Sequence, residues 1–225
     1  MSSEENVEPM ETEQRPLRAD AERNRRALLQ AATAAFCEGG LEVGVGEIAE
    51  RAGVGRGTLF RHFPTKEHLI AAIVVERMNE AIARGEALLD APSPGAALFS
   101  FIDETAGRQP MDYALFEAIN DVWLDNNEIR AAHAELIGTL DRLLTRAQEA
   151  GEARADISAI DVMIMVKGAC EASRSFLHID PRIGERQLDL VRAAIGAAGP
   201  EQRLRGRKPT VEDLERTLPA ASEAL

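Results

Sequence analysis

The sequence contains few aromatic residues and few cysteines. Aromatic residues make up 4% of the 225 residues, with one Trp and one Tyr, and only two residues are Cys. Sustained alternation of apolar and polar residues, the pattern of a half-buried strand, is also missing. Ala, Leu, Glu and Arg dominate instead, and these residue types favour helix. We therefore expect an all-α protein, long enough for one or two domains with a sizeable core.

Two further absences bear on where the protein works. No apolar run approaches the roughly 18 residues that a membrane-spanning helix needs, and the first residues are acidic, unlike the basic start of a secretory signal. Cys37 and Cys170 lie far apart in apolar helical contexts, without a CxxC motif, which is typical of buried free thiols in a reducing compartment. These features predict a soluble, cytoplasmic protein.

Common catalytic and metal-binding motifs are missing as well. The chain has no GxSxG, phosphate-binding loop, dinucleotide-binding glycine set or paired carboxylates at a characteristic spacing. His133 and His178 do not have metal-ligand spacing with each other or with either cysteine. We expect no metal, no cofactor and no enzymatic activity. A small helical enzyme stays as an alternative, but it would give no role to the motif at residues 45–66.

The net charge of −12 argues against a uniformly basic nucleic-acid coat. Its distribution is uneven, because residues 1–14 carry five Glu and no cation, whereas 11 cations and 11 anions balance in residues 15–90. An acidic body with one local basic face limits non-specific DNA adhesion and leaves one docking surface; the alternative is that these cations only solvate helix faces. The cations concerned are Arg51, Arg56, Arg61 and Lys66, preceded by Arg15, Arg18, Arg23, Arg25 and Arg26.

Residues 45–66, with the sequence VGEIAERAGVGRGTLFRHFPTK, predict two short helices joined by a glycine turn. Gly53 suits the stop between them, because glycine enters the left-handed cap conformation without steric cost. The residues expected to be buried are Ile48, Ala49 and Ala52 in the first helix and Val54, Leu59 and Phe63 around the second.

The exposed face of the second helix then carries small and cationic groups at its leading end. A short helix of this kind suits the major groove of DNA; the alternative is an ordinary helical hairpin. The residues on this face are Arg56, Gly57, Thr58, Phe60, Arg61 and His62.

Breaks and caps divide the rest of the chain. We expect a disordered acidic tail at 1–16, a helix-turn-helix DNA-binding domain at 17–64, a helical effector-binding and dimerisation domain at 65–199, and a charged tail at 200–225. Asp20 and Thr65 are predicted to cap the helices that follow them. The predicted helices outside the hairpin cover 20–38, 65–89, 95–107, 111–121, 127–150, 158–178 and 183–197.

The stretch Val162-Met-Ile-Met-Val166 is apolar on all sides, so its helix must be covered on both sides. One side can pack on its own domain, and the other, together with the amphipathic helix at 183–197, predicts a four-helix interface between two subunits. The alternative is a central helix buried inside a monomer.

The chain resembles the TetR family of transcriptional regulators. The resemblance covers residues 20–75 and rests on the segments AAFCEGGLE and IAERAGVGRGTLFRHFPTKEHL. It implies an all-helical homodimer with a DNA-binding head and a larger body that binds a small molecule. In this family, ligand binding normally moves the long connecting helix, separates the two heads and releases DNA.

The resemblance also assigns roles to single residues. Arg56 and Thr58 occupy positions that usually touch bases, Gly57 allows close approach to the DNA, and His62 and Lys66 occupy positions that usually face phosphates. The complete DNA-binding set that we expect also contains Gly44, Val45, Phe60 and Arg61. The family usually has a hydroxyl residue where Gly44 stands, a serine at Gly55 and a tyrosine at Phe60, so we expect weaker phosphate anchoring without loss of base reading.

The resemblance thus predicts a repressor that binds an inverted-repeat, double-stranded DNA operator as a homodimer and is released by an apolar small-molecule effector. A regulator without an effector, or an activator, remains an alternative. An apolar cavity with one or two polar groups is the usual form of a small-molecule site, although the candidates also fit plain core. They are Phe99, Asp103, Met111, Phe116, Trp123, Met163 and Cys170.

Overall fold

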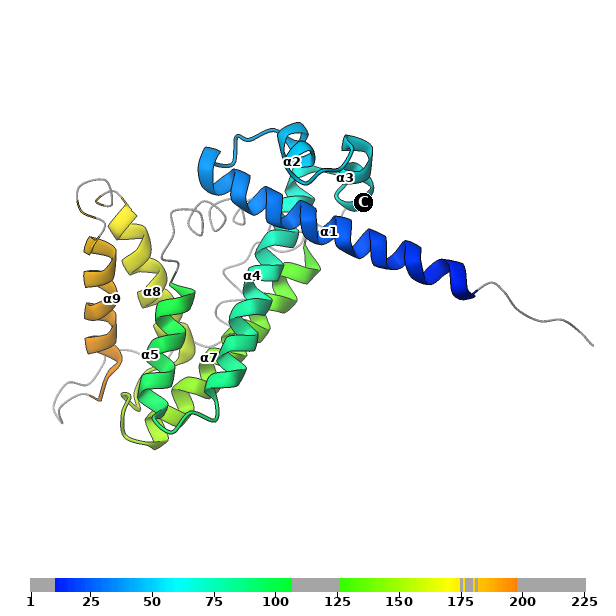
Figure 1. The fold of residues 1–225 in the computed structure, drawn as a ribbon. Coiled ribbons are helices and arrows are strands. Elements are labelled where there is room, and N and C mark those ends of the chain that lie inside the picture. The colour runs from blue at the N-terminus through cyan, green and yellow to red at the C-terminus, as the bar shows by residue number, and fades with distance from the viewer. Residues whose placement is uncertain (1–10, 107–125, 175, 177–179, 181, 198–225) are drawn as a thin grey trace, which may run out of the picture. The chain divides into compact units, whose positions relative to one another are not determined.

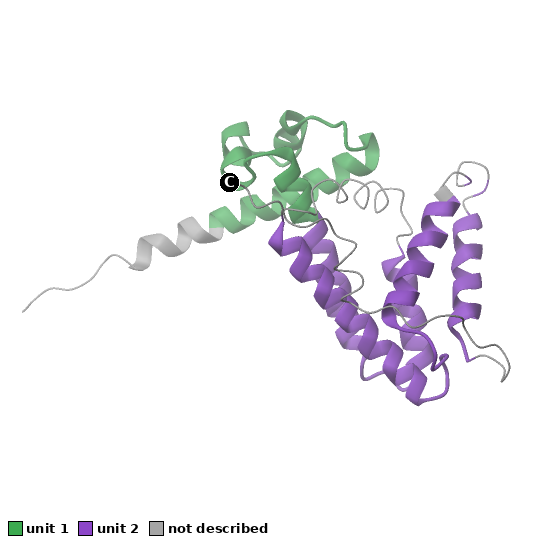
Figure 2. Ribbon diagram, turned by 180° about the vertical axis from the view of Figure 1, so that it is seen from behind, with its two compact units in different colours: residues 1–73 green, residues 74–225 purple. Residues whose placement is uncertain are grey.

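The computed structural model describes residues 11–106, 126–174, 176, 180 and 182–197 (Figure 1). The regular structure in these ranges consists of eight helices, which confirms the predicted all-α class, and the only strand-like pairing there is one isolated bridge between Ala153 and Gly196. No helix among the described residues combines the length and the apolar character that crossing a membrane requires. The chain divides into two compact units, residues 1–73 and 74–225, which Figure 2 colours separately.

The first unit contains three helices and the start of a fourth. Its elements are α1 (Glu11–Gly39), α2 (Val45–Arg51), α3 (Arg56–His62) and the first turns of α4 (Lys66–Leu88). The second unit contains the rest of α4, then α5 (Pro94–Thr105), α7 (Asn127–Glu149), α8 (Ala159–Arg174) and α9 (Arg182–Ile195). The helix predicted at 111–121 and the tail predicted at 200–225 lie outside the described residues.

Three boundaries differ from the sequence prediction. Helix α1 begins at Glu11, so the start predicted at Asp20 was wrong, and residues 11–16 of the predicted disordered tail are helical. Apart from Thr12 and Pro16, residues 11–19 are Glu, Gln, Arg, Leu and Ala, which favour helix. Helix α8 ends at Arg174 instead of 178. The division between units falls after Ile73, inside α4, instead of after Pro64.

The core of the first unit is formed by apolar faces of its four helices. Two cations close over its rings: the Lys66 Nζ lies 5.9 Å from the Phe36 ring centroid, and the Arg25 Cζ lies 5.4 Å from that of Phe63. Such contacts stabilise by about 0.5–1 kcal/mol each at exposed sites. The buried side chains include Leu28, Leu29, Ala32, Phe36, Ile48, Leu59, Phe63 and Leu69.

The second unit packs α5 on α7 and α8 on α9 around one apolar core. Helix α9 runs antiparallel to α8. The C-terminal end of α9 lies beside the residues that precede the start of α8, where Arg154 N donates to Ile195 O at 2.9 Å. Helix α7 begins at a cap that sequence reasoning missed, where the Asn126 side chain accepts hydrogen bonds from Glu128 N and Ile129 N.

The apolar stretch of α8 is covered on one side only. Val162 is fully buried, but Ile164 is 55% exposed, and in α9 Leu190 is 53% exposed. A helix buried at the centre of a monomer is therefore not what this chain forms. The expectation of two buried thiols was also wrong, because Cys37 is exposed and Cys170 is half-buried.

Candidate nucleic-acid interface

Gly53 ends α2 as predicted. Its φ of +68° lies in the left-handed region that favours glycine. The turn closes through two backbone hydrogen bonds, from Gly53 N to Glu50 O and from Val54 N to Ala49 O, both 3.0 Å long. This pairing is the Schellman arrangement, which satisfies the last carbonyls of α2 and turns the chain towards α3.

The two short helices bury the predicted apolar side chains and expose the predicted face. Ile48 and Leu59 are fully buried, while Phe63 is 3% exposed; Ala52 and Val54 are half-buried. On the other face Arg56, Gly57, Phe60, Arg61 and Gly44 are exposed, whereas Val45, Thr58, His62 and Lys66 are half-buried.

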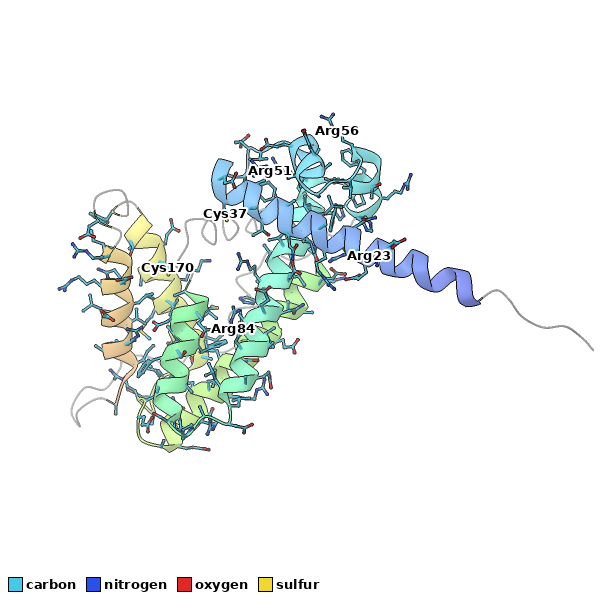
Figure 3. All side chains as sticks on the ribbon, viewed as in Figure 1. Arg23, Cys37, Arg51, Arg56, Arg84 and Cys170 are labelled. Atoms are coloured by element: carbon cyan, nitrogen blue, oxygen red, sulfur yellow. The ribbon has the colours of Figure 1, made fainter. Side chains whose placement is uncertain are left out.

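Arg51, one of the four clustered cations, is already occupied by the protein. Its guanidinium donates to Glu38 Oε2 at 2.6 Å and to Glu47 Oε1 at 2.7 Å. Figure 3 labels Arg51 on the ribbon. The hydrogen bonds to Glu38 and Glu47 raise the pKa of Arg51. Because Glu38 lies in α1 and Glu47 in α2, Arg51 ties these two helices together and is not a free charge for DNA.

Arg56 and Arg61 differ from Arg51 in this respect. Both are exposed, and neither makes an ion pair or hydrogen bond with the described residues. Phe60 lies between them in sequence, and its ring is 46% exposed. Helix α3 therefore presents two available cations and one aromatic ring to a partner.

The Arg56 side chain lies against the backbone of α2. A β-carbon built on Gly46 would stand 2.7 Å from both Cζ and Nε of Arg56, closer than real side-chain atoms come. The guanidinium thus lies across the second residue of α2. Sequence reasoning missed Gly46, because nothing in the spacing links it to Arg56.

Both short helices lack a side-chain cap. Gly44 precedes α2 and Gly55 precedes α3, and neither can offer a hydroxyl to the first amide groups. Thr65 does cap α4, since its Oγ1 accepts from His68 N at 3.4 Å. His62 lies beside Phe63, with ring centroids 6.3 Å apart.

The effector candidates that fall on described residues lie on two helices of the second unit. Phe99 in α5 and Met163 in α8 pack against the apolar core. Asp103 in α5 forms an ion pair with Arg192 of α9, and Cys170 Sγ donates to Ala106 O at 3.0 Å. The other three candidates, Met111, Phe116 and Trp123, lie outside the described residues.

His133 is a further polar group in this unit. It is half-buried on α7, and burial together with the positive charge of Lys167 lowers its pKa to about 4. The imidazole is therefore neutral near pH 7. Sequence reasoning considered His133 only as a metal ligand.

Comparison with known proteins decides the family. Residues 28–73 match the model described as bacterial regulatory proteins, tetR family, and residues 93–195 match that of the SbtR-like transcriptional regulator C-terminal domain. The HTH-type transcriptional repressor KstR of Rhodococcus jostii is 30% identical over 149 residues, which cover 64% of this chain and 69% of that protein. The chain belongs to the TetR family. It is thus a DNA-binding transcriptional regulator and not an enzyme, as predicted.

Solved structures of TetR proteins share the fold. A TetR regulator from Mycobacterium vanbaalenii is 35% identical with a TM-score of 0.62, and the match covers 80% of this chain and 99% of that one. A second, from Streptomyces coelicolor, is 30% identical with a TM-score of 0.60, covering 78% and 99%. The predicted architecture, a helix-turn-helix head followed by a helical body, is confirmed for this TetR protein.

Proposed function

We propose that this TetR protein is a ligand-responsive repressor. Two subunits bind an inverted-repeat operator through their α3 helices, and an apolar small molecule releases them from it. The observation that carries the proposal is the face of α3, where Arg56 and Arg61 are exposed and make no ion pair with described residues, beside the exposed ring of Phe60. Because its target is DNA, we place the protein in the cytoplasm.

The roles of the α3 side chains follow from their chemistry. Arg56 stands at the first position of α3, and a guanidinium can donate two hydrogen bonds to O6 and N7 of guanine. Thr58 meets a thymine methyl or a phosphate, and Gly57 leaves room for close approach. Arg61, His62 and Lys66 contact phosphates, with Gly44 and Val45 beside the start of α2; these contacts add affinity without sequence information.

Dimerisation would cover the apolar groups that the second unit leaves exposed. Ile164 is 55% exposed on α8 and Leu190 is 53% exposed on α9, although each helix also contributes buried residues to the core, Val162 on α8 and Val191 on α9. Exposed large apolar groups gathered on one helix pair mark an interaction surface. Pairing two copies through α8 and α9 gives a four-helix interface with two-fold symmetry.

Repression is supported by related proteins, and effector release by half-buried residues of the second unit. The KstR proteins of Rhodococcus jostii and Mycolicibacterium smegmatis, each 30% identical to this chain, are named transcriptional repressors. Phe99, Met163 and Cys170 are half-buried on α5 and α8, so they can line an apolar site between helices.

DNA reading is tested with Arg56→Ala. Fluorescence anisotropy gives the dissociation constants for a duplex selected by the wild-type protein and for its scrambled version. We expect the variant to lose at least about 1 kcal/mol of discrimination, roughly fivefold. Arg61→Ala is the control, and it should weaken binding to both duplexes alike. An unchanged preference in Arg56→Ala would reject the assignment.

Effector release is tested with Trp123, the only tryptophan in the chain. A panel of apolar compounds is screened for quenching of its fluorescence and for release of the labelled operator. We expect at least one compound to do both. If none releases the operator, the protein is a regulator without a small-molecule effector.

A further inference from the structure

Gly46 leaves a space that the Arg56 side chain fills. Three atoms of the guanidinium group, Nε, Cζ and Nη2, lie closer to a β-carbon built at position 46 than real side-chain atoms come. Gly46 is the second residue of α2 and Arg56 is the first residue of α3, so the side chain crosses from one helix of the motif to the other. Any residue other than glycine would displace it.

No ion pair or hydrogen bond with the described residues holds the guanidinium in this place. Glu38 and Glu47, the carboxylates that bind Arg51, form no ion pair with Arg56. The proximity of the guanidinium to Gly46 is therefore the feature of the structure that bears on the direction of the Arg56 side chain. The N–H donors of the guanidinium stay available for a base.

From this geometry we infer that Gly46 is a positioning residue for the reading of the DNA sequence. This role rests on the base contact proposed for Arg56. A long, flexible side chain loses freedom when it is fixed on a base, and restricting it beforehand reduces that loss. Glycine at position 46 restricts Arg56 by giving its guanidinium one surface to lie on. Gly46 thereby contributes to operator specificity, although it has no side chain with which to touch a base.

Gly46→Ala is a suitable variant because it leaves the fold intact. Alanine favours helix more than glycine does, so α2 keeps its structure. The atoms that the new β-carbon meets belong to the end of a flexible side chain, which can move away. The variant should therefore displace Arg56 and disturb little else. Circular dichroism and thermal unfolding check this, with an unchanged helix content and a melting temperature no lower than that of the wild-type protein as the expected result.

The test is a double-mutant cycle with the wild-type protein, Gly46→Ala, Arg56→Ala and the double variant. Dissociation constants are measured by anisotropy for the selected duplex and for duplexes with single base-pair changes. We expect Gly46→Ala to lower discrimination by about 3- to 10-fold at the base pair that Arg56 reads. In the Arg56→Ala background the same change should have no effect, because the two residues act together. Gly138→Ala, in the other unit and with open space around the new β-carbon, should leave DNA binding unchanged.

The other outcomes separate the two claims. If Arg56→Ala itself leaves the preference unchanged, the base contact proposed for Arg56 fails. If Arg56→Ala lowers discrimination but Gly46→Ala does not, the positioning role of Gly46 is overturned. Equal losses from Gly46→Ala in both backgrounds would also overturn it, since Gly46 would then act independently of Arg56.

Discussion

The guanidinium of Arg51 in α2 donates a 2.6 Å hydrogen bond to the carboxylate of Glu38 near the end of α1. The same guanidinium also binds Glu47 within α2. Arg51 thus links α2 to α1, and its charge is paired with carboxylates of the protein itself.

Replacing Arg51 by methionine removes this connection and keeps much of the apolar side chain. We expect a lower melting temperature and weaker binding to operator and scrambled duplexes alike, because α2 loses its tie to α1 while the base-reading face stays intact. Thermal unfolding and anisotropy check this. A selective loss of operator preference would mean that Arg51 reads DNA after all. Glu50→Ala, an exposed change in the same helix, is the control.

Gly55→Ser adds the hydroxyl that commonly stands at this position in TetR proteins. The backbone at Gly55 is extended, with φ −73° and ψ 150°, and a β-carbon there meets nothing within 4 Å. The serine would cap α3, worth a few tenths of a kcal/mol over glycine, and would offer a phosphate contact. We expect both duplexes to bind about threefold more tightly, with unchanged discrimination. Gly55→Ala, without a hydroxyl, should not tighten binding.

The dimer is tested through the apolar groups exposed on α8 and α9. We expect Ile164→Glu combined with Leu190→Glu to give a monomer in sedimentation experiments and to abolish tight operator binding, because a buried charge opposes association. Ala83→Glu, an exposed change on α4, should leave the dimer intact. A monomeric wild-type protein, or a dimer that survives both charges, would contradict the proposed interface.

His133 makes stability depend on pH. Burial and Lys167 lower its pKa from 6.5 to about 4 in the folded protein. Between these values the unfolded chain binds the proton and the folded protein does not. The neutral His133 therefore costs the folded protein no stability above pH 6.5, and the free energy of unfolding falls as the pH drops from 6.5 towards 4. The full shift corresponds to about 3 kcal/mol, and residual solvent contact reduces this to about 2 kcal/mol.

Urea unfolding at pH 7 and pH 4.5 measures the effect of His133. The His133→Gln variant should lose less stability on acidification than the wild-type protein, because the carboxylates titrate in both and the imidazole in only one. Equal losses would show that His133 is not a buried neutral group.

Gly85 marks a close approach of α4 to α5 and α7. A β-carbon built on it would lie 2.7 Å from Phe101 Cε2 and would also meet Thr139 Cγ2. We expect Gly85→Ala to lower the free energy of unfolding by about 1–3 kcal/mol through overpacking. Gly138→Ala on α7 meets nothing within 4 Å, so its helix propensity should make it neutral or stabilising. Equal effects of the two changes would contradict the close packing at Gly85.

Features that depend on neighbouring residues could be predicted from the sequence. Gly53 ends α2, and Leu59 and Phe63 are buried, because a turn glycine and the helical spacing of apolar residues are local signals. Cys37 could have been placed correctly by the same spacing. The buried residues of α1 recur three or four positions apart, and Cys37 falls outside that spacing; they are Leu28, Leu29, Ala32, Ala35 and Phe36.

Features that depend on distant residues could not be predicted. Arg51 looked like a cation for DNA, because Glu38 is 13 residues away and only folding brings the two together. The contact of Arg56 with Gly46 joins two helices and has no signature in spacing. The predicted start of α1 was wrong for a different reason, since Asp20 resembles a cap although most of the residues before it also favour helix.

The most direct test of the central claim is selection of bound sequences from random duplex DNA, read out by sequencing. The proposed dimer predicts enrichment of an inverted repeat whose half-sites lie about one helical turn apart, because protein two-fold symmetry appears in the site. Enrichment of an unpaired half-site, or none at low salt, would contradict the account of a dimer that reads DNA through α3.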